Sequence, residues 1–122
     1  MKKLICHCGE VELEIKESEG VLNKFLRCNC TLCKKKGYIM TFAPITDVKI
    51  VKGEDKLKLY QYHTKVAEHY FCSECGIYTH HKMRSRPDTF GLNVGCIDDI
   101  DQFKLENVGL NDGQNHPMDQ KK

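Results

Sequence analysis

The most regular alternation of apolar and polar residues in this chain covers residues 11–15. Val11, Leu13 and Ile15 fall on one face of an extended segment, and the two glutamates between them fall on the other. This period of two predicts a half-buried β-strand, and Gly20 marks the loop that follows it.

Further strands are predicted where short apolar runs are bounded by turn residues. In the first half of the chain these runs are residues 22–27, 38–42 (stopped by Pro44), 48–51 and 57–62. The last two runs flank Gly53-Glu54-Asp55, a turn sequence, and are predicted to form a hairpin. The alternation of apolar and polar residues breaks between Leu59 and Tyr60, which indicates either a β-bulge or a strand with apolar residues on both faces.

The second half of the chain predicts a strand, a cysteine-containing knuckle and another strand. Residues 66–71 lead into this knuckle and residues 77–81 lead out of it. Residues 90–96 alternate again, with their apolar side chains on one face, and one helical turn is predicted around residues 98–103. Short strands, glycine-rich turns and almost no helical periodicity together predict an all-β fold.

The length of 122 residues predicts one domain, because two independent cores would need a longer chain. We assign residues 1–110 to this domain and expect the polar residues 111–122 to form a disordered tail. Apolar residues make up 40% of the chain and Trp is absent, so metal cross-links would add stability to a modest core. No apolar run is long enough for a signal peptide or a membrane span, which predicts a soluble, cytoplasmic protein without membrane partners.

Seven of the eight cysteines fall into three tight clusters. The clusters are Cys6 with Cys8, then Cys28, Cys30 and Cys33, then Cys72 with Cys75. Clustered thiols in a reducing compartment are typical zinc ligands, whereas cysteines two or three positions apart would form strained disulfide rings. Seven thiols divide into one complete tetrahedral site and one three-ligand site with an open position. An iron–sulfur cluster on the middle three cysteines and a fourth thiol is a further alternative.

The formal net charge of the chain is +2. Seven bound thiolates would contribute seven negative charges and two zinc ions four positive ones, which brings the metal-loaded charge to −1. This balance argues against a nucleic-acid partner. Lys34, Lys35 and Lys36 form a local basic run that fits a solvated loop; beside an open metal site, these lysines could also hold the carboxylates of an anionic substrate.

Spacing alone leaves the pairing of the cysteine clusters open. Cys8 and Cys28 are 20 positions apart, near a zinc-ribbon spacing, so the first two clusters could share a metal. That pairing would leave Cys33 with Cys72 and Cys75. Alternatively, the first and last clusters close a four-thiolate site between distant hairpins, and the middle cluster forms a second site from one contiguous loop.

Four sequence motifs follow one another in a characteristic order. They are Cys6-His7-Cys8-Gly9, Cys28-Asn29-Cys30-Thr31-Leu32-Cys33 with the basic residue and glycine that follow, Tyr70-Phe71-Cys72-Ser73-Glu74-Cys75-Gly76, and Asn93-Val94-Gly95-Cys96-Ile97-Asp98. In order and spacing they resemble the glutathione-dependent formaldehyde-activating enzyme family, which includes centromere-protein-V-like domains. The resemblance spans about residues 5–100, and it implies an all-β assembly of small coiled sheets.

The resemblance also implies two zinc ions per chain. It assigns the structural zinc to Cys6, Cys8, Cys72 and Cys75. It assigns the catalytic zinc to Cys28, Cys30 and Cys33. The implied reaction joins glutathione, or another small thiol, to formaldehyde or another small aldehyde, and gives an adduct such as S-hydroxymethylglutathione.

The chemistry of a three-thiolate zinc fits this reaction class. Such an ion keeps a net charge of about −1, so it is a weak Lewis acid and is better suited to bind a fourth thiol as a thiolate. A thiolate beside an aldehyde carbon adds to it, and the reverse reaction cleaves a carbon–sulfur bond. The leading hypothesis is therefore a zinc-dependent carbon–sulfur lyase. The alternatives are a non-catalytic, zinc-stabilised binding module, in which Cys96 or a histidine fills the fourth position, and a zinc-ribbon-like nucleic-acid binder.

The histidines are interpreted mainly as structural or surface residues. His7 is expected to be an exposed turn residue between two ligands. His80 and His81 alternate across a strand, so at most one faces any given site, and a surface role is expected for each. His63 and His69 precede the last cysteine pair, where one of them could serve as a proton shuttle for the aldehyde oxygen.

The other candidate polar residues are also assigned to the scaffold. Cys96 lies on the apolar face of a predicted strand and is expected to be a buried structural thiol. Asp98 and Asp99 fit a turn or a helix cap. Tyr38 follows the open site directly and is expected to pack in the core rather than to line a pocket.

Overall fold

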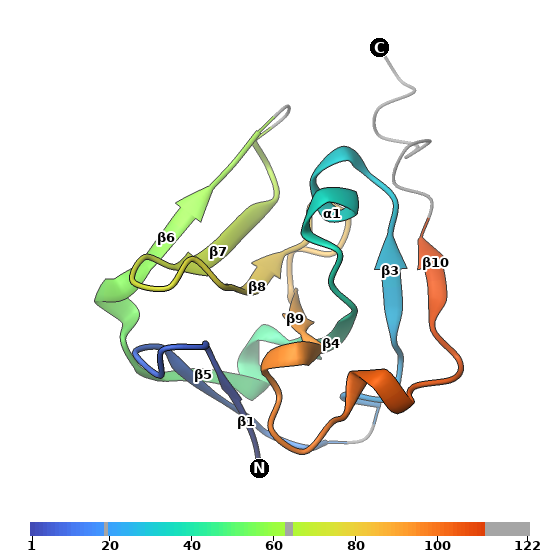
Figure 1. The fold of residues 1–122 in the computed structure, drawn as a ribbon, viewed down its shortest axis with the longest axis horizontal. Helices are drawn as coiled ribbons and strands as arrows, with labels where there is room; N and C mark the ends of the chain where they lie inside the picture. The colour runs from blue at the N-terminus through green and yellow to red at the C-terminus, as the bar shows by residue number, and fades with distance from the viewer. Residues whose placement is uncertain (19, 63–64, 112–122) are drawn as a thin grey trace.

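The protein is built almost entirely of short β-strands (Figure 1). The computed structural model describes residues 1–18, 20–62 and 65–111. In these ranges the strands are β1 (Lys2–Ile5), β2 (Glu12–Ile15), β3 (Leu26–Cys28), β4 (Met40–Pro44), β5 (Val48–Lys52), β6 (Leu57–Tyr60), β7 (Glu68–Cys72), β8 (Tyr78–Lys82), β9 (Thr89–Asn93) and β10 (Gly109–Asn111). The helical segments are α1 (Thr31–Lys36) and the single 3₁₀ turns η1 (Ile45–Asp47), η2 (Glu54–Lys56), η3 (Val94–Cys96) and η4 (Gln102–Lys104). The predicted all-β fold is confirmed.

The strands form two sheets. The smaller sheet has the order β1-β2-β5, and the larger has the order β10-β3-β4-β9-β8-β7-β6. Neighbouring strands run antiparallel except β10 and β3, which pair in parallel. In Figure 1 the β6–β7 arm lies on one side of α1 and the β3–β10 pair on the other.

The predicted hairpin of residues 48–51 and 57–62 is wrong. A turn does form at Gly53 and η2, but β5 pairs with β2 in the small sheet whereas β6 pairs with β7 in the large one. The connection therefore carries the chain from one sheet to the other. β6 is the edge strand of its sheet, and Leu59 and Tyr60 are about half exposed, so the break in apolar alternation falls at the exposed end of this strand. The register with β7 is continuous there, which excludes a bulge.

Several other predicted elements differ in length or type. The run 22–27 is regular only at β3, and the run 38–42 becomes strand only from Met40 onward. The three lysines belong to α1, not to a loop. Gly37 ends this helix with a left-handed backbone (φ 65°), the conformation that glycine adopts without strain. The knuckle between β7 and β8 is present as predicted.

The main hydrophobic core lies around the small sheet. Leu4, Val11, Leu13 and Ile15 are fully buried there, which confirms the alternation predicted for residues 11–15. Leu92 and Ile97 pack into the same cluster from the region of β9. Burying such side chains supplies roughly 1.5–3 kcal/mol each.

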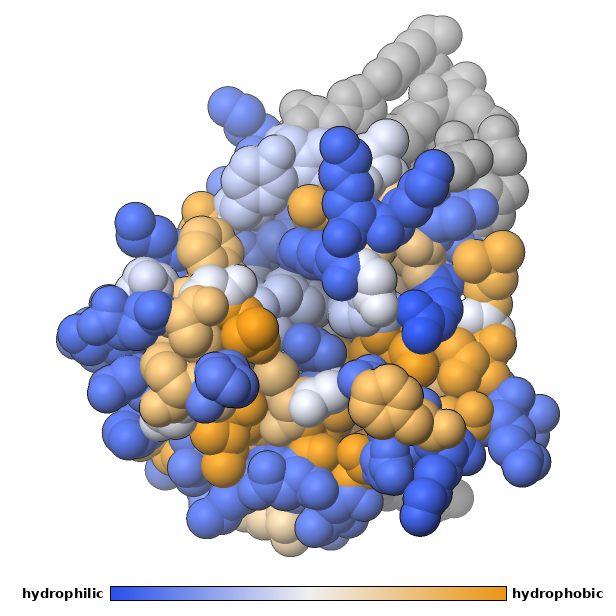
Figure 2. Space-filling view, viewed as in Figure 1, coloured by the Kyte–Doolittle hydropathy of each residue, from blue (hydrophilic) through white to orange (hydrophobic). Residues whose placement is uncertain are grey.

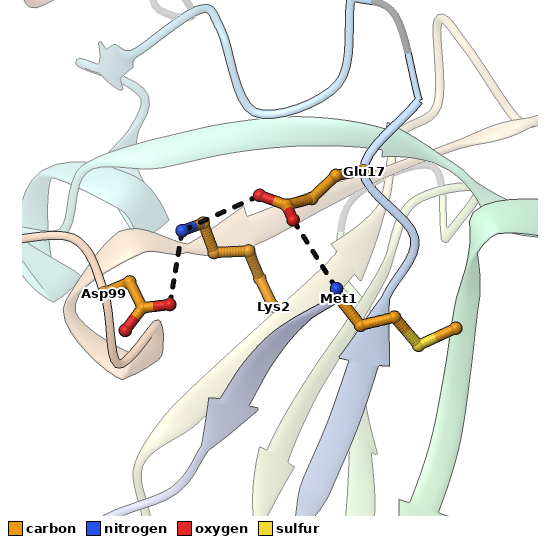
Figure 3. Close-up of polar contacts among 4 residues, drawn as sticks. All are labelled: Met1, Lys2, Glu17 and Asp99. Carbon is orange, nitrogen blue, oxygen red and sulfur yellow. Dashed lines mark hydrogen bonds and ion pairs between the residues drawn. The ribbon is translucent and has the colours of Figure 1, made fainter.

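The N-terminus is tied to two distant segments (Figure 3). The Met1 ammonium lies 3.5 Å from Glu17, and the Lys2 ammonium bridges Glu17 at 3.6 Å and Asp99 at 3.2 Å. These contacts bring the start of β1 beside the end of β2 and the segment that follows η3. Each pair includes a solvent-exposed acidic side chain, so each contributes little, about 0–1 kcal/mol.

The surface combines apolar and charged areas. Figure 2 shows orange hydrophobic side chains gathered across the lower half of one face, with blue polar side chains along its margins. Among the described residues, no helix is both long and apolar enough to cross a membrane. Asn111, which was assigned to the tail, is the last residue of β10, and residues 112–122 lie outside the described ranges.

Candidate metal centres and their surroundings

The fold brings the first and last cysteine clusters together. The Sγ atoms of Cys6, Cys8, Cys72 and Cys75 all lie within 4.8 Å of one another. Cys6 and Cys8 belong to the turn between β1 and β2, whereas Cys72 is the last residue of β7 and Cys75 lies in the turn that leads to β8. Figure 1 shows these two turns side by side, although 64 positions separate Cys8 from Cys72. Of the two pairings left open by spacing, the fold therefore realises the one between distant hairpins.

The spacing of these four sulfurs suits a tetrahedral ion. Cys6 and Cys8 are 3.6 Å apart and Cys8 and Cys72 are 3.7 Å apart, measured between Sγ atoms. Four sulfurs that are each about 2.3 Å from a zinc ion are about 3.8 Å apart in a tetrahedron. Backbone N–H groups of Val11 and Glu74 also point at the sulfurs of Cys6 and Cys72, at 3.3 and 3.4 Å. Such donors stabilise thiolates and orient them toward a metal.

The middle cysteines form a separate three-thiol cluster. The Sγ atoms of Cys28, Cys30 and Cys33 lie within 4.8 Å of one another, and within the described ranges no further Cys, His, Asp or Glu atom joins them. Cys28 ends β3, Cys30 caps the N-terminus of α1, and Cys33 lies one turn into that helix. The Cys33 amide donates to the Cys30 sulfur at 3.3 Å, which aligns two thiols on one helical turn.

The three thiols strongly influence one another. Hydrogen bonds from Cys28 and Cys33 hold the pKa of the Cys30 thiol well below its usual range. The same contacts raise the pKa of Cys33, which supplies a proton to its neighbours. Neighbouring thiols therefore stabilise the Cys30 thiolate by hydrogen bonds, and a bound dication would take the place of their protons.

β10 closes one side of the three-thiol cluster. Asn111 pairs in register with Cys28, and its side-chain amide lies 3.6 Å from the Cys28 sulfur. The backbone carbonyl of Asn111 accepts a hydrogen bond from the Asn29 amide at 3.2 Å. The residue that was predicted to begin a tail thus contacts a candidate metal ligand.

An arch of five aromatic rings connects two of these thiols. From Cys33, the rings follow one another in the order Tyr38, Tyr78, His81, His69 and Tyr62, and the last one reaches Cys30. The Tyr38 hydroxyl lies 3.5 Å from the Cys33 sulfur, and the Tyr62 hydroxyl lies 3.8 Å from the Cys30 sulfur. We call this set of rings the aromatic arch.

The interior of the aromatic arch is held by ring contacts. The ring centroids of Tyr38 and Tyr78 are 4.5 Å apart. The rings of His69 and His81 are stacked, with their centroids 5.4 Å apart. The Tyr78 hydroxyl hydrogen-bonds to Nδ1 of His81. The Nδ1 atom of His69 is buried and has no hydrogen-bond partner among the residues that the structure describes. The arch thus places rings, hydroxyls and one unpaired imidazole nitrogen beside the three-thiol cluster.

Lys36 lies against this arch. Its ammonium nitrogen is 3.7 Å from the centroid of the Tyr78 ring and 6.0 Å from that of Tyr38, both within range of a cation–π contact. Burial lowers the pKa of Lys36 to about 8, while the thiols of Cys33 and Cys30 act in the opposite direction. Lys34 and Lys35, by contrast, are exposed on the same helix.

The predicted surface role of the paired histidines is wrong. His80 is 1% exposed and His81 6% exposed, and burial lowers their pKa values to about 4 and about 3. Their alternation across β8 does hold: His81 belongs to the aromatic arch, whereas His80 stacks on Tyr70 and contacts Phe90. Both are buried because rings from neighbouring strands cover the two faces of this central strand.

The remaining histidine predictions have mixed outcomes. His7 is exposed in its turn, as predicted. His69 is 5% exposed and belongs to the arch, and burial lowers its pKa to about 4. A role for it as a proton shuttle stays a prediction. His63 lies outside the described residues.

The scaffold predictions for the other polar residues are largely confirmed. Cys96 is buried and lies outside both thiol clusters, with Asn93 Nδ2 at 3.5 Å from its sulfur. Burial raises its pKa to about 12. Tyr38 is buried, as predicted, but it also contacts Cys33. The cap of η4 is Asp101, whereas Asp99 pairs with Lys2.

Tyr62, Tyr78 and Asn111 were not identified from the sequence. Each lies beside the middle cluster only through strand pairing or ring stacking with residues far along the chain. The one signal available was the series of aromatic and histidine residues between positions 60 and 81, which is unusually dense for a chain with 8% aromatic residues.

A family model and a curated relative point to one family. Residues 1–108 match the family described as "Glutathione-dependent formaldehyde-activating enzyme". An Emericella nidulans protein named "Putative glutathione-dependent formaldehyde-activating enzyme" is 27% identical over 95 residues, which cover 75% of this chain and 47% of that protein. The chain thus spans about half the length of this curated relative. A crystal structure of a Rhodobacter sphaeroides protein is 39% identical, with a TM-score of 0.83 over 89% of this chain and 99% of that one.

Proposed function

The chain belongs to the glutathione-dependent formaldehyde-activating enzyme family, and from this premise we propose that it is a zinc-dependent carbon–sulfur lyase. Its reaction would form or cleave a thiol–aldehyde adduct. The observation that carries the proposal is the cluster of three thiols without a fourth protein ligand among the described residues. We propose Cys28, Cys30 and Cys33 as the ligands of a catalytic zinc.

A second zinc, with a structural role, is proposed at the four-thiol cluster. Its ligands would be Cys6, Cys8, Cys72 and Cys75. Four protein thiolates would complete a tetrahedral shell and leave no position for a guest molecule. The site would cross-link two turns that belong to different sheets, which is the role expected of a structural zinc in a small domain.

The residues around the middle cluster support the proposed chemistry. Bound zinc would supply a position at which a thiol is held as a thiolate. In the reaction, thiolate sulfur bonds to the aldehyde carbon, the carbonyl electron pair moves to the oxygen, and that oxygen takes up the proton that the thiol released. The hydroxyls of Tyr62 and Tyr38 lie beside the sulfurs of Cys30 and Cys33, where they are available to donate hydrogen bonds.

The proposed substrates are a small thiol, with glutathione as the first candidate, and a small aldehyde such as formaldehyde. The family description names this pair, and the buried aromatic arch favours a small aldehyde beside the cluster. Free thiols at both clusters need a reducing environment, which supports a cytoplasmic location. We propose neither a nucleic-acid partner nor a membrane partner.

Metal analysis combined with cobalt substitution tests the proposal. The wild-type protein is expected to hold two zinc ions per chain, and the cobalt form is expected to change its visible spectrum when glutathione is added. Exchange spectroscopy by NMR should then show faster conversion between glutathione, formaldehyde and their adduct than in buffer alone.

Two variants serve as the matched comparison. Cys30→Ala is expected to lose one metal ion, the spectral change and the rate enhancement. Cys96→Ala removes a buried thiol outside both clusters. This variant is expected to keep both metal ions, the spectral change and the rate enhancement. A single zinc in well-prepared wild-type protein, or a cobalt spectrum indifferent to thiols, would contradict the proposal and favour the non-catalytic module.

A further inference from the structure

Lys36 is a charged side chain that lies directly against the aromatic arch. α1 directs its three lysines differently: Lys34 and Lys35 are exposed, whereas Lys36 is partly buried over the face of Tyr78 at 3.7 Å. The Tyr38 ring, which the same ammonium approaches at 6.0 Å, contacts the Cys33 sulfur directly through its hydroxyl. Tyr38 therefore contacts both the Lys36 ammonium and the three-thiol cluster.

No carboxylate accounts for the position of Lys36. None of the ion pairs within residues 1–18, 20–62 and 65–111 includes it; the lysines that do pair with acidic residues are Lys2, Lys3 and Lys56. A half-buried ammonium without a negative partner is costly. Cys33 lies three positions before Lys36 in α1, where side chains are neighbours on the helix surface, so the cysteine cluster is a negative charge within reach of this ammonium.

The charge of the loaded cluster explains why a cation is useful there. Three thiolates and one zinc ion carry a net charge of about −1, and an incoming thiolate would raise this to about −2. A neutral guest would leave the charge unchanged. A fixed positive charge beside the cluster therefore lowers the energy of the complex with an anionic guest more than that of the complex with a neutral guest.

We infer that Lys36 is a specificity-determining residue, which selects anionic over neutral ligands at the open position of the three-thiol centre. This inference rests on the proposed function, because it needs a metal ion held by Cys28, Cys30 and Cys33. It goes beyond that function by assigning the preference for a thiolate to one residue of α1. Lys36 acts on the guest through its charge and does not itself bind the metal.

The test compares two probes on the cobalt-substituted protein at constant pH and ionic strength. The first probe is 2-mercaptoethanol, which binds such a centre as a thiolate, and the second is imidazole, which binds as a neutral ligand. Dissociation constants come from the change in the visible spectrum. Lys36→Met is expected to weaken thiol binding about tenfold, as loss of an ion pair worth about 1.4 kcal/mol would, and to change imidazole binding less than twofold.

Two further variants are matched controls. Lys35→Met removes the same charge from an exposed position of the same helix and should leave both dissociation constants unchanged. Lys36→Arg keeps the positive charge and should retain most of the preference for thiol. Equal weakening for both probes, or no weakening in Lys36→Met, would overturn the inference and leave the proposed function intact. A wild-type centre that binds neither probe would overturn both.

Discussion

At the scale of single residues, Gly91 explains how an imidazole fits between two paired strands. Gly91 of β9 pairs with His81 of β8, and a Cβ atom built on this glycine would lie 2.1 Å from Cε1 of the His81 ring. The missing side chain therefore provides the space in which His81 stacks on His69 and meets Tyr78. Gly91 is not a member of the aromatic arch, but its lack of a side chain allows His81 to take its place there.

We expect Gly91→Ala to displace His81 and to destabilise the protein by roughly 1–3 kcal/mol, the usual cost of overpacking. Gly95→Ala is the control, because the nearest atom to its new Cβ is the flexible end of Gln102 at 3.2 Å. Thermal unfolding measures the stability, and the NMR signals of the histidine rings report the displacement. Equal melting temperatures for the two variants would contradict this account of Gly91.

At the scale of elements, the link between β5 and β6 holds the two cysteine turns together. A Cβ atom on Gly53 would lie 1.9 Å from the carbonyl oxygen of Glu10, next to the first cysteine turn. At the other end of the link, the carbonyl of Lys56 accepts a hydrogen bond from the Ser73 amide in the second turn, at 2.8 Å. The segment that leaves the small sheet therefore contacts residues that neighbour both cysteine pairs of the four-thiol cluster.

Substitution of Gly53 by Ala should consequently weaken the four-thiol site as well as the fold. Gly53 has φ 78° and Gly20 has φ 83°, so both variants incur left-handed strain of about 1 kcal/mol, but only the Cβ on Gly53 meets backbone. We expect Gly53→Ala to cost about 2 kcal/mol more than Gly20→Ala in chemical denaturation. It should also release zinc to a chelator faster. Similar stability and similar zinc release in both variants would exclude the proposed close contact with Glu10.

At the scale of the whole molecule, three buried histidines link stability to pH. Burial lowers the pKa of His69 and His80 to about 4 and that of His81 to about 3, all below the ordinary value of 6.5. As pH falls, the unfolded chain therefore binds protons before the folded one does. The stability that these residues contribute is complete above about pH 6.5 and is lost as the pH falls toward about 4.

The free energy of unfolding is therefore expected to decrease between pH 6.5 and pH 4, by roughly 1–3 kcal/mol for each buried histidine. Denaturant unfolding at a series of pH values measures the decrease, with metal content checked at each pH because thiolates also take up protons. NMR titration of the ring signals identifies the residues. If the three rings became charged between pH 6 and 7 in the folded protein, this explanation would be wrong.

Local features of the molecule followed from the sequence alone. The alternation of Val11, Leu13 and Ile15 predicted a strand with one buried face, because side chains of a strand point alternately to its two sides. The spacing of the cysteines predicted the knuckle between β7 and β8. It also placed Cys28, Cys30 and Cys33 close together in the chain, although spacing alone left open which cysteines share a metal. The burial of Cys96 followed from the apolar residues around it.

Only the tertiary structure decided what lies beside these local features. The packing of the two sheets placed Cys8 next to Cys72. Strand pairing carried β5 and β6 into different sheets and brought Asn111 to the three-thiol cluster, which Tyr62 reaches with its hydroxyl. The physical reason is the same in each case. A periodic pattern records whether a side chain is buried or exposed, which is a property of one segment, whereas the partner that covers it is chosen by the packing of all segments together.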